Sequence, residues 1–305
     1  MKEHIFLAGL LSAFTVTTVA AFAEDSPTLA KIRQSGTISL GHMETSVPFS
    51  YYDQNQEVIG YSREIQLRIV ESIKAKLGLD SLVVRNMPIT SQNRIPLIQN
   101  GTVDIECSST THNLERAKQV AFSNSIFLIQ TRLLTATDSG VTDFEDLKGK
   151  TVVTMAGTTS ERLLRAMNQD RQMGMSVISA KDQGESFQTL ETGRAIAYMS
   201  DDAVLAGQKA RSRTPEKWQI VGKPQSKEVY GCLMRRDDPQ FKKIADDVIA
   251  KLETSPEIDD LYKKWFETPV PPRGLNLGFP MSAGLKALYK SPNNTASDDL
   301  NKAGQ

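Results

Sequence analysis

Residues 61–87 read YSREIQLRIVESIKAKLGLDSLVVRNM, a helix pattern followed within a few residues by a strand pattern. Apolar residues recur four positions apart and a glycine follows the last of them, which predicts an amphipathic helix with a glycine stop. These apolar residues are Ile65, Ile69, Ile73 and Leu77. The next run, SLVVRNM, has the pattern of a strand. A helix and a strand in close succession form the repeating unit of an α/β protein.

The same alternation continues on both sides of this stretch. Strand patterns occur at 37–41 and 103–107, and a second series of strands and helices begins near residue 131. Alternating strands and helices predict parallel sheets covered by helices. The chain ends in a proline-rich tail whose last residues have the composition of a disordered segment.

The first residues, MKEHIFLAGLLSAFTVTTVAAFAED, have the layout of a secretory signal peptide. A lysine precedes an apolar run that is short for a membrane span, and small residues at 21 and 23 precede an acidic pair. We therefore expect export and cleavage after Ala23, with an N-terminal membrane anchor as the alternative. The remaining chain is long enough for two domains.

Charge and cysteine content exclude several classes of function. The 36 basic and 36 acidic residues cancel, so nothing in the composition indicates nucleic acid or an anionic membrane as a partner. In an exported protein the two cysteines, Cys107 and Cys232, suggest a disulfide, and two buried free thiols are the alternative. Three histidines, one of them in the signal, are too few for a histidine-rich metal site, and we expect no metal and no cofactor.

Hydroxyl-bearing and charged residues follow several of the predicted strands. The run SSTTHNLER could place its hydroxyls beside Arg116, and a guanidinium group can grip a carboxylate through two parallel hydrogen bonds. The alternative is an ordinary helix cap followed by an exposed arginine.

Three other stretches could bind ionic groups, and each has a structural alternative. The turn AGTTSE begins a helix whose free N–H groups favour an anion, unless Thr159 or Ser160 simply caps that helix. Asp201 ends an apolar strand and could hold an ammonium group or cap the next helix. Ser91 is expected to cap a short helix, where Arg94 could receive a second carboxylate or could simply be solvated.

Several motifs occur in order along nearly the whole chain: GHMETSVPFSYYD, ITSQNRIPLIQNGT, ECSSTTHNLERAKQVAFS, AGTTSE, SAKDQGESFQTLETGRAIAYMSDDAVLAG and KWFETPVPPRGLNL. In these motifs the chain resembles the periplasmic glutamate/aspartate-binding proteins of ABC amino-acid importers, which form solute-binding protein family 3. The resemblance implies the α/β, two-lobed, type II periplasmic-binding-protein fold. Each lobe would be a sheet flanked by helices, and two hinge strands would join the lobes.

The resemblance also implies an organisation and a role. The first lobe would comprise residues 24–127 plus 226–305 with the C-terminal tail, and the second lobe residues 128–225. The protein would capture glutamate or aspartate in the periplasm, close over it, and deliver it as a monomer to an ABC permease without chemical reaction. In this fold the segments of Cys107 and Cys232 lie close together near the hinge, which favours a disulfide.

Carried over onto this sequence, the resemblance assigns roles to individual residues. Arg116 would hold the α-carboxylate of the ligand together with Ser109, Thr111 and Thr159. Asp201 would take the α-ammonium group from the second lobe. The hydroxyls and the arginine would therefore form one anion clamp.

The side chain of the ligand would face Ser91 and Arg94, but two nearby positions depart from the family pattern. The family usually has arginine and histidine where this chain has Met43 and Gln183. Losing one charge-assisted hydrogen bond would weaken binding about ten- to a hundredfold. A neutral ligand side chain would leave Arg94 buried without a partner, at a cost of several kcal/mol, which favours an anionic ligand.

Two alternatives stay open. Gln183 could pair with a carboxamide, so the ligand could be glutamine or asparagine. The protein could also be an exported dehydratase of cyclic acids on the same scaffold, with Glu44 or Glu106 as its general acid.

Overall fold

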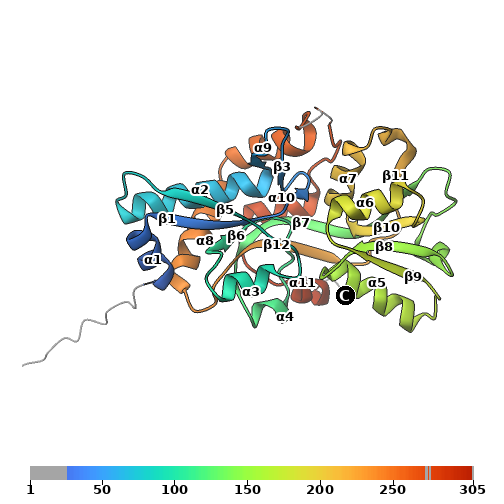
Figure 1. Cartoon of the computed structure of the whole chain (residues 1–305), viewed down its shortest axis with the longest axis horizontal. Coiled ribbons are helices and arrows are strands. Elements are labelled where there is room, and N and C mark those ends of the chain that lie inside the picture. The colour runs from blue at the N-terminus through green and yellow to red at the C-terminus, as the bar shows by residue number, and fades with distance from the viewer. Residues whose placement is uncertain (1–25, 272–273, 275, 304–305) are drawn as a thin grey trace, which may run out of the picture.

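The structure is a computed structural model that describes residues 26–271, 274 and 276–303. The predicted signal peptide, with its cleavage point after Ala23, lies outside the described residues. Within the described part of the chain, no helix combines the length and the apolar character that a membrane crossing needs. The molecule is elongated, with β1 and β5 in one half and β8 and β9 in the other (Figure 1).

The first sheet has the strand order β5-β1-β6-β12-β7. Its strands are β1 (Thr37–His42), β5 (Val83–Pro88), β6 (Ile105–Glu106), β7 (Ala121–Ala136) and β12 (Lys227–Met234). β1 pairs in parallel with β5 and β6, as the alternation of strands and helices predicts. β12 is antiparallel to both β6 and β7, so the prediction of wholly parallel sheets is wrong.

Helices from both ends of the chain accompany the first sheet. They are α1 (Pro27–Ser35), α2 (Tyr61–Leu77), α3 (Arg94–Gln99), α4 (Leu114–Ala117), α8 (Pro239–Glu253), α9 (Glu257–Tyr262) and the π-helix η3 (Lys263–Glu267). A small separate sheet contains β2 (Thr45–Ser46), β3 (Ser50–Tyr52) and β4 (Val58–Ile59). Helix α2 buries Ile65, Ile69 and Ile73 on one face. It ends at Gly78, whose φ of 63° is a left-handed conformation that glycine adopts without strain.

β7 is one strand of 16 residues, although the sequence pattern predicts a strand only from about residue 131. Up to Gln130 it pairs with β12, and from Thr131 it pairs with β10 (Ala197–Asp201). β7 therefore belongs to two sheets and runs lengthwise between the two halves of the molecule (Figure 1). All of the strands that pair with β7, which are β10, β11 and β12, run antiparallel to it.

The second sheet contains the last part of β7 with β8 (Thr151–Met155), β9 (Ser176–Ala180), β10 and β11 (Trp218–Val221). Its helices are α5 (Thr159–Asp170), α6 (Gln183–Glu191), α7 (Asp202–Arg211) and the 3₁₀ helices η1 (Phe144–Leu147) and η2 (Pro215–Lys217). The neighbours Leu133 and Leu134 belong to different apolar clusters, because successive strand residues point to opposite faces. Both faces of the second sheet are therefore covered.

The C-terminal segment is ordered, so the prediction of a disordered tail is wrong for its described residues. It forms α10 (Ala283–Lys290) and α11 (Ser297–Ala303), and Figure 1 places α11 at the middle of the molecule. The hydroxyl of Ser297 accepts from the Val229 N–H at 3.0 Å and donates to the His112 carbonyl at 2.8 Å. The polar residues that suggested disorder here make the tertiary hydrogen bonds.

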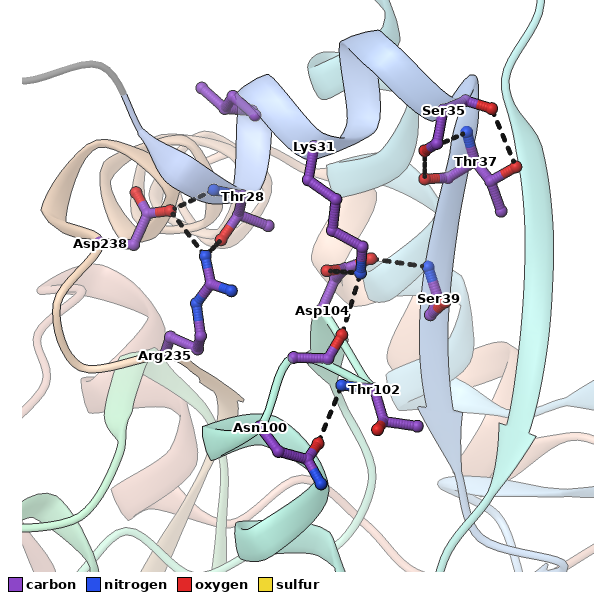
Figure 2. A network of polar contacts seen from close by, with 12 residues as sticks. Thr28, Lys31, Ser35, Thr37, Ser39, Asn100, Thr102, Asp104, Arg235 and Asp238 are labelled. Atoms are coloured by element: carbon purple, nitrogen blue, oxygen red, sulfur yellow. Dashed lines mark hydrogen bonds and ion pairs between the residues drawn. The ribbon is translucent and has the colours of Figure 1, made fainter.

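A polar network fastens α1 to the body of the first sheet (Figure 2). The carboxylate of Asp238 accepts from the Thr28 N–H at 3.0 Å. Asp104 accepts from the Lys31 ammonium group at 2.8 Å. Both carboxylates are buried, so these bonds replace lost hydration and anchor the first described helix.

Cys107 and Cys232 form a disulfide in this structure, with their Cα atoms 4.4 Å apart. It joins the residue after β6 to the middle of β12. Both half-cystines are fully buried within the first sheet. The bond therefore ties the N-terminal strands to a strand that arrives 125 residues later.

Candidate functional site

The predicted binding residues lie on segments that meet at the junction of the two sheets. Ser109, Thr111 and Arg116 follow β6 of the first sheet. Thr159 begins α5 after β8, and Asp201 ends β10. All follow the carboxyl ends of strands, which is where α/β sheets place ligand-binding groups.

Arg116 spans the junction through its guanidinium group. It donates to the Thr111 carbonyl at 2.9 Å and, across the junction, to the Gly157 carbonyl at 3.2 Å. Asn113 caps α4, with its side-chain oxygen 2.9 Å from the Arg116 N–H. The run thus contains a helix cap, but Arg116 is half-buried rather than exposed.

Thr111 and Thr159 bind a carboxylate of the protein itself. Both hydroxyls donate to the same oxygen of Glu228, each at 2.7 Å, and Ser226 donates to its other oxygen at 2.9 Å. Glu228 is a buried residue of β12 that sequence reasoning missed. Its signal in the sequence was a carboxylate at the start of a strand that is mostly apolar from Val229 onward.

The start of α5 explains why Thr159 is available for this contact. Thr158 is the N-cap residue, and its side chain accepts from the Glu161 N–H at 3.1 Å. The alternative that Thr159 or Ser160 caps this helix is therefore wrong. Their hydroxyls instead point to carboxylates, that of Thr159 to Glu228 and that of Ser160 to Asp201 at 3.3 Å.

Asp201 precedes α7 but makes no capping hydrogen bond. It accepts from the hydroxyls of Ser160 and Tyr230. The next residue, Asp202, accepts from the backbone at the helix start instead. Burial, and after it the charge of Glu228, raises the pKa of Asp201 to about 7.

Arg94 is only 2% exposed, so the alternative of a solvated arginine is wrong. It donates to the Thr110 hydroxyl at 2.6 Å, and Thr110 donates to Glu106 at 2.8 Å. Burial raises the pKa of the fully buried Glu106, and the charge of Arg94 opposes this rise. The expectation that a neutral ligand would leave Arg94 without a partner is therefore wrong, because it did not include Glu106.

Ser91 is buried but does not cap α3, which follows Asn93 and has no side-chain cap. Its backbone lies close to Gly157, which follows β8 of the second sheet. A Cβ atom built on Gly157 would be 3.3 Å from the Ser91 carbonyl carbon. Ser91, Arg116 and Thr159 line one groove of about 460 Å³.

The two positions that depart from the family pattern are both buried. Met43 is 2% exposed and packs in an apolar cluster that also contains Met155 of the second sheet. Gln183 is 4% exposed, and its amide nitrogen lies 3.4 Å from the hydroxyls of Ser46 and Ser109, which are 2.9 Å from each other. Met43 thus contributes packing, whereas Gln183 brings an amide to the junction.

Ionic groups of both signs are buried at this junction, which suits a small molecule that carries both charges. The cations are the buried Arg94 and the half-buried Arg116, and the buried carboxylates are Glu106, Asp201 and Glu228. Burial, and after it the charge of Arg94, lowers the pKa of Arg116 to about 9, and the charges of Glu228 and Asp201 oppose this fall. No group of three or more histidine, cysteine, aspartate or glutamate side chains in the described ranges could hold a metal ion.

Comparisons with known proteins agree on one family. The model of the bacterial extracellular solute-binding proteins, family 3, matches residues 38–268. A glutamate/aspartate import solute-binding protein of Salmonella typhimurium is 56% identical over 281 residues, which cover 90% of this chain and 93% of that protein. An L-glutamate/L-aspartate-binding protein of Pseudomonas aeruginosa is 53% identical, with 96% of each chain covered.

A solved structure shows the same architecture. The crystal structure of a mutant of ArgBP from T. maritima matches with a TM-score of 0.69 and 25% sequence identity. The match covers 79% of this chain and 99% of that chain. The additional residues of this chain therefore lie outside the shared fold.

Proposed function

Because this chain belongs to the bacterial extracellular solute-binding proteins of family 3, we propose that it captures glutamate or aspartate in the periplasm for an ABC permease. It has the type II periplasmic-binding-protein fold, as the resemblance predicts. We assign it no chemical reaction, and relatives with more than half of its residues identical are named for import or binding. It would act as a monomer whose closed form the membrane subunits recognise.

The proposed lobes are residues 24–127 plus 226–305 and residues 128–225. The change of partner along β7, between Gln130 and Thr131, supports a hinge close to these limits. The returning chain lies beside it, with the hydroxyls of Thr131 and Ser226 2.6 Å apart. Two adjacent crossing segments of this kind can bend together while each lobe stays rigid.

The placement of Arg116 is the observation that carries the proposal. Its guanidinium group donates to one carbonyl from each proposed lobe, those of Thr111 and Gly157. A ligand carboxylate between the lobes would replace these neutral acceptors with charge-assisted hydrogen bonds, which are stronger. Binding would therefore favour the closed arrangement over the open one.

The other proposed contacts complete an amino-acid site. Asp201 would pair with the α-ammonium group, and Ser109, Thr111 and Thr159 would surround the α-carboxylate. The two threonines would do so through their backbone N–H groups, because their hydroxyls donate to Glu228. Ser91 and Arg94 would face the side-chain carboxylate of the ligand. The two arginines and the buried carboxylates at the junction support this assignment.

Calorimetric titration with glutamate and aspartate tests the function, after unfolding and refolding to remove any bound amino acid. The wild type should bind both acids. Arg116→Met should weaken binding at least about a hundredfold, because two charge-assisted hydrogen bonds are lost. Arg213→Met changes an exposed arginine and is the matched control. A wild type that binds neither acid, or an Arg116→Met variant that binds equally well, would overturn the proposal.

A further inference from the structure

A second cavity, of about 900 Å³, lies within the proposed first lobe. The end of α8, helix α9 and helix α10 line it, and α8 contacts both of the other helices. None of the residues proposed to bind the amino acid lines this cavity. Helix α10 follows residue 268, at which the family match ends, so the matched residues alone do not complete the cavity.

The inner end of this cavity contains a buried carboxyl group. Glu253, the last residue of α8, is 5% exposed, whereas the charged side chains of α9 and α10 that line the cavity are exposed. Among the described residues, neither Oε1 nor Oε2 of Glu253 has a hydrogen-bond partner. A buried polar group without a partner is costly, so a ligand that donates to both oxygens gains affinity.

The phenol groups near Glu253 do not satisfy its carboxyl group. Burial raises the pKa of Tyr289, and the charge of Glu253 adds to this rise, which places the carboxyl group near a second residue of the cavity lining. The Tyr289 hydroxyl lies 2.7 Å from that of Tyr61 and 3.3 Å from the Ile126 carbonyl oxygen, to which Tyr61 donates at 3.0 Å. Both phenolic protons are therefore engaged, and Glu253 stays open to a donor from the cavity.

The charges around the cavity favour a cation at Glu253. Because Glu253 ends α8, the negative end of that helix dipole lies beside its carboxyl group. Helix α9 is short, and three carboxylates in its first turn oppose the positive end of its own dipole. The exposed charges of the lining cancel, since three carboxylates are matched by three lysines: Asp259, Asp260 and Glu267 with Lys263, Lys286 and Lys290. The inner end therefore determines the sign of the ligand.

The shape of the unpaired group and the apolar lining indicate which cation would fit. The two oxygens of one carboxylate match a planar guanidinium or amidinium group, which donates two parallel hydrogen bonds. Buried side chains of Ile258, Tyr262 and Tyr289 line the same cavity and suit an apolar body. Tyrosine rings also attract cations through their faces.

We propose that this cavity is a second binding site, for an organic cation with a guanidinium or amidinium head group and an apolar body. The head group would donate one hydrogen bond to each oxygen of Glu253. The lining comes wholly from residues 253–290, within the proposed first lobe. The site is therefore independent of the proposed amino-acid function and of lobe closure.

Calorimetric titration with benzamidine and with its uncharged isostere benzamide tests the site. At about pH 8.5 the wild type should bind benzamidine at least about thirtyfold more tightly, because only the amidinium group forms charge-assisted hydrogen bonds with the carboxylate. Saturating glutamate should leave the benzamidine affinity unchanged, since the two sites share no residue.

Two results of this titration would overturn the inference and leave the proposed function standing. One is equal affinity for benzamidine and benzamide, and the other is loss of benzamidine binding when glutamate is added. A wild type that binds benzamidine but neither acidic amino acid would support this site and overturn only the proposed function.

Glu253→Gln tests the role of the buried carboxyl group, because it keeps the shape of the side chain and removes its charge. Benzamidine affinity should fall at least about tenfold, while benzamide affinity stays within about threefold. An unchanged glutamate affinity would show that the variant is folded. Glu257→Gln changes an exposed carboxylate of α9 that does not line the cavity, so it is the matched control. Unchanged benzamidine affinity in Glu253→Gln would overturn the inference.

The pH dependence gives a second measure of the same contact. Burial raises the pKa of Glu253 to about 9, so at lower pH the amidinium group must displace a proton. Benzamidine affinity should therefore rise by up to about tenfold per pH unit between pH 7 and 9. Glu253→Gln retains the other ionisable groups of the lining, which are Asp259, Asp260, Tyr262, Lys263, Glu267, Lys286, Tyr289 and Lys290. A rise that persists in this variant would assign the effect to those groups and overturn the role of Glu253.

Discussion

The side-chain oxygens of Thr111 and Thr159 lie 3.5 Å apart, although they belong to segments that follow strands of different sheets. Each hydroxyl donates to the same oxygen of Glu228. A carboxylate on β12 therefore holds together two loops that come from opposite sides of the junction. The proposed ligand contacts depend on a residue that neither loop contains.

We expect Glu228→Ala to lower the free energy of unfolding by about 2 to 4 kcal/mol, because three hydroxyls lose their buried acceptor. Glu228→Gln should cost less than half of this, since its amide oxygen can still accept from the two threonines. Urea unfolding measures both values. Glu216→Ala changes an exposed carboxylate and should stay within about 0.5 kcal/mol of the wild type. Equal losses in the alanine and glutamine variants would contradict the role of the acceptor.

Glutamate affinity should rise as the pH increases from 5 to about 7. The pKa of Asp201 is raised to about 7, so the ligand-free protein holds a proton there that an ammonium group must displace. The affinity should gain up to about tenfold per pH unit below this pKa and level off above it. The same shift makes the ligand-free protein less stable as the pH rises toward 7, because its folded state binds more protons than the unfolded chain.

Titrations in buffers of different ionisation enthalpy would measure the released proton directly. About one proton per bound glutamate is expected near pH 6. Burial lowers the pKa of both His42 and His112, so a histidine would not produce a transition near pH 7. Asp201→Asn should remove the pH dependence, and a flat profile in the wild type would rule out this coupling.

Reduction of the Cys107–Cys232 disulfide should lower the free energy of unfolding by about 4 to 5 kcal/mol. The bond closes a loop across 125 residues. A loop of this length lowers the conformational entropy of the unfolded chain, which raises the free energy of that chain by about 4 to 5 kcal/mol. Urea unfolding with and without a reductant measures the difference. A Cys107→Ala/Cys232→Ala variant should resemble the reduced protein and should not respond to the reductant. Unchanged stability of the wild type on full reduction would refute the prediction.

Ser297→Ala should destabilise the protein by about 1 to 2 kcal/mol, because the buried Val229 N–H loses its partner. The affected strand residue adjoins Glu228, so amino-acid affinity should fall as well. Urea unfolding and calorimetry measure the two effects. Ser291→Ala, at an exposed position near the end of α10, is the control and should behave like the wild type. If both variants match the wild type, α11 does not brace this strand.

Local periodicity predicted the elements of the fold well where the chain is regular. The apolar spacing of Ile65, Ile69 and Ile73 predicts helix α2 and its buried face, and Gly78 ends that helix as expected. The family resemblance is confirmed by the family match over residues 38–268, and it predicts the fold class. These features are readable because backbone geometry and burial repeat over a few residues.

Only the tertiary structure decided which groups meet. The path of β7 through two sheets, the helices of the C-terminal segment and the bridge from Arg94 through Thr110 to Glu106 all depend on distant partners. Glu228 is the clearest case, because the sequence of its strand does not indicate that it accepts hydrogen bonds from two threonine hydroxyls. The sequence by itself determined most of the elements and the family, and it suggested the candidate site residues, which stay a prediction. Folding decided how the buried charges are paired, because the energy of a charge depends on neighbours that can lie a hundred residues away.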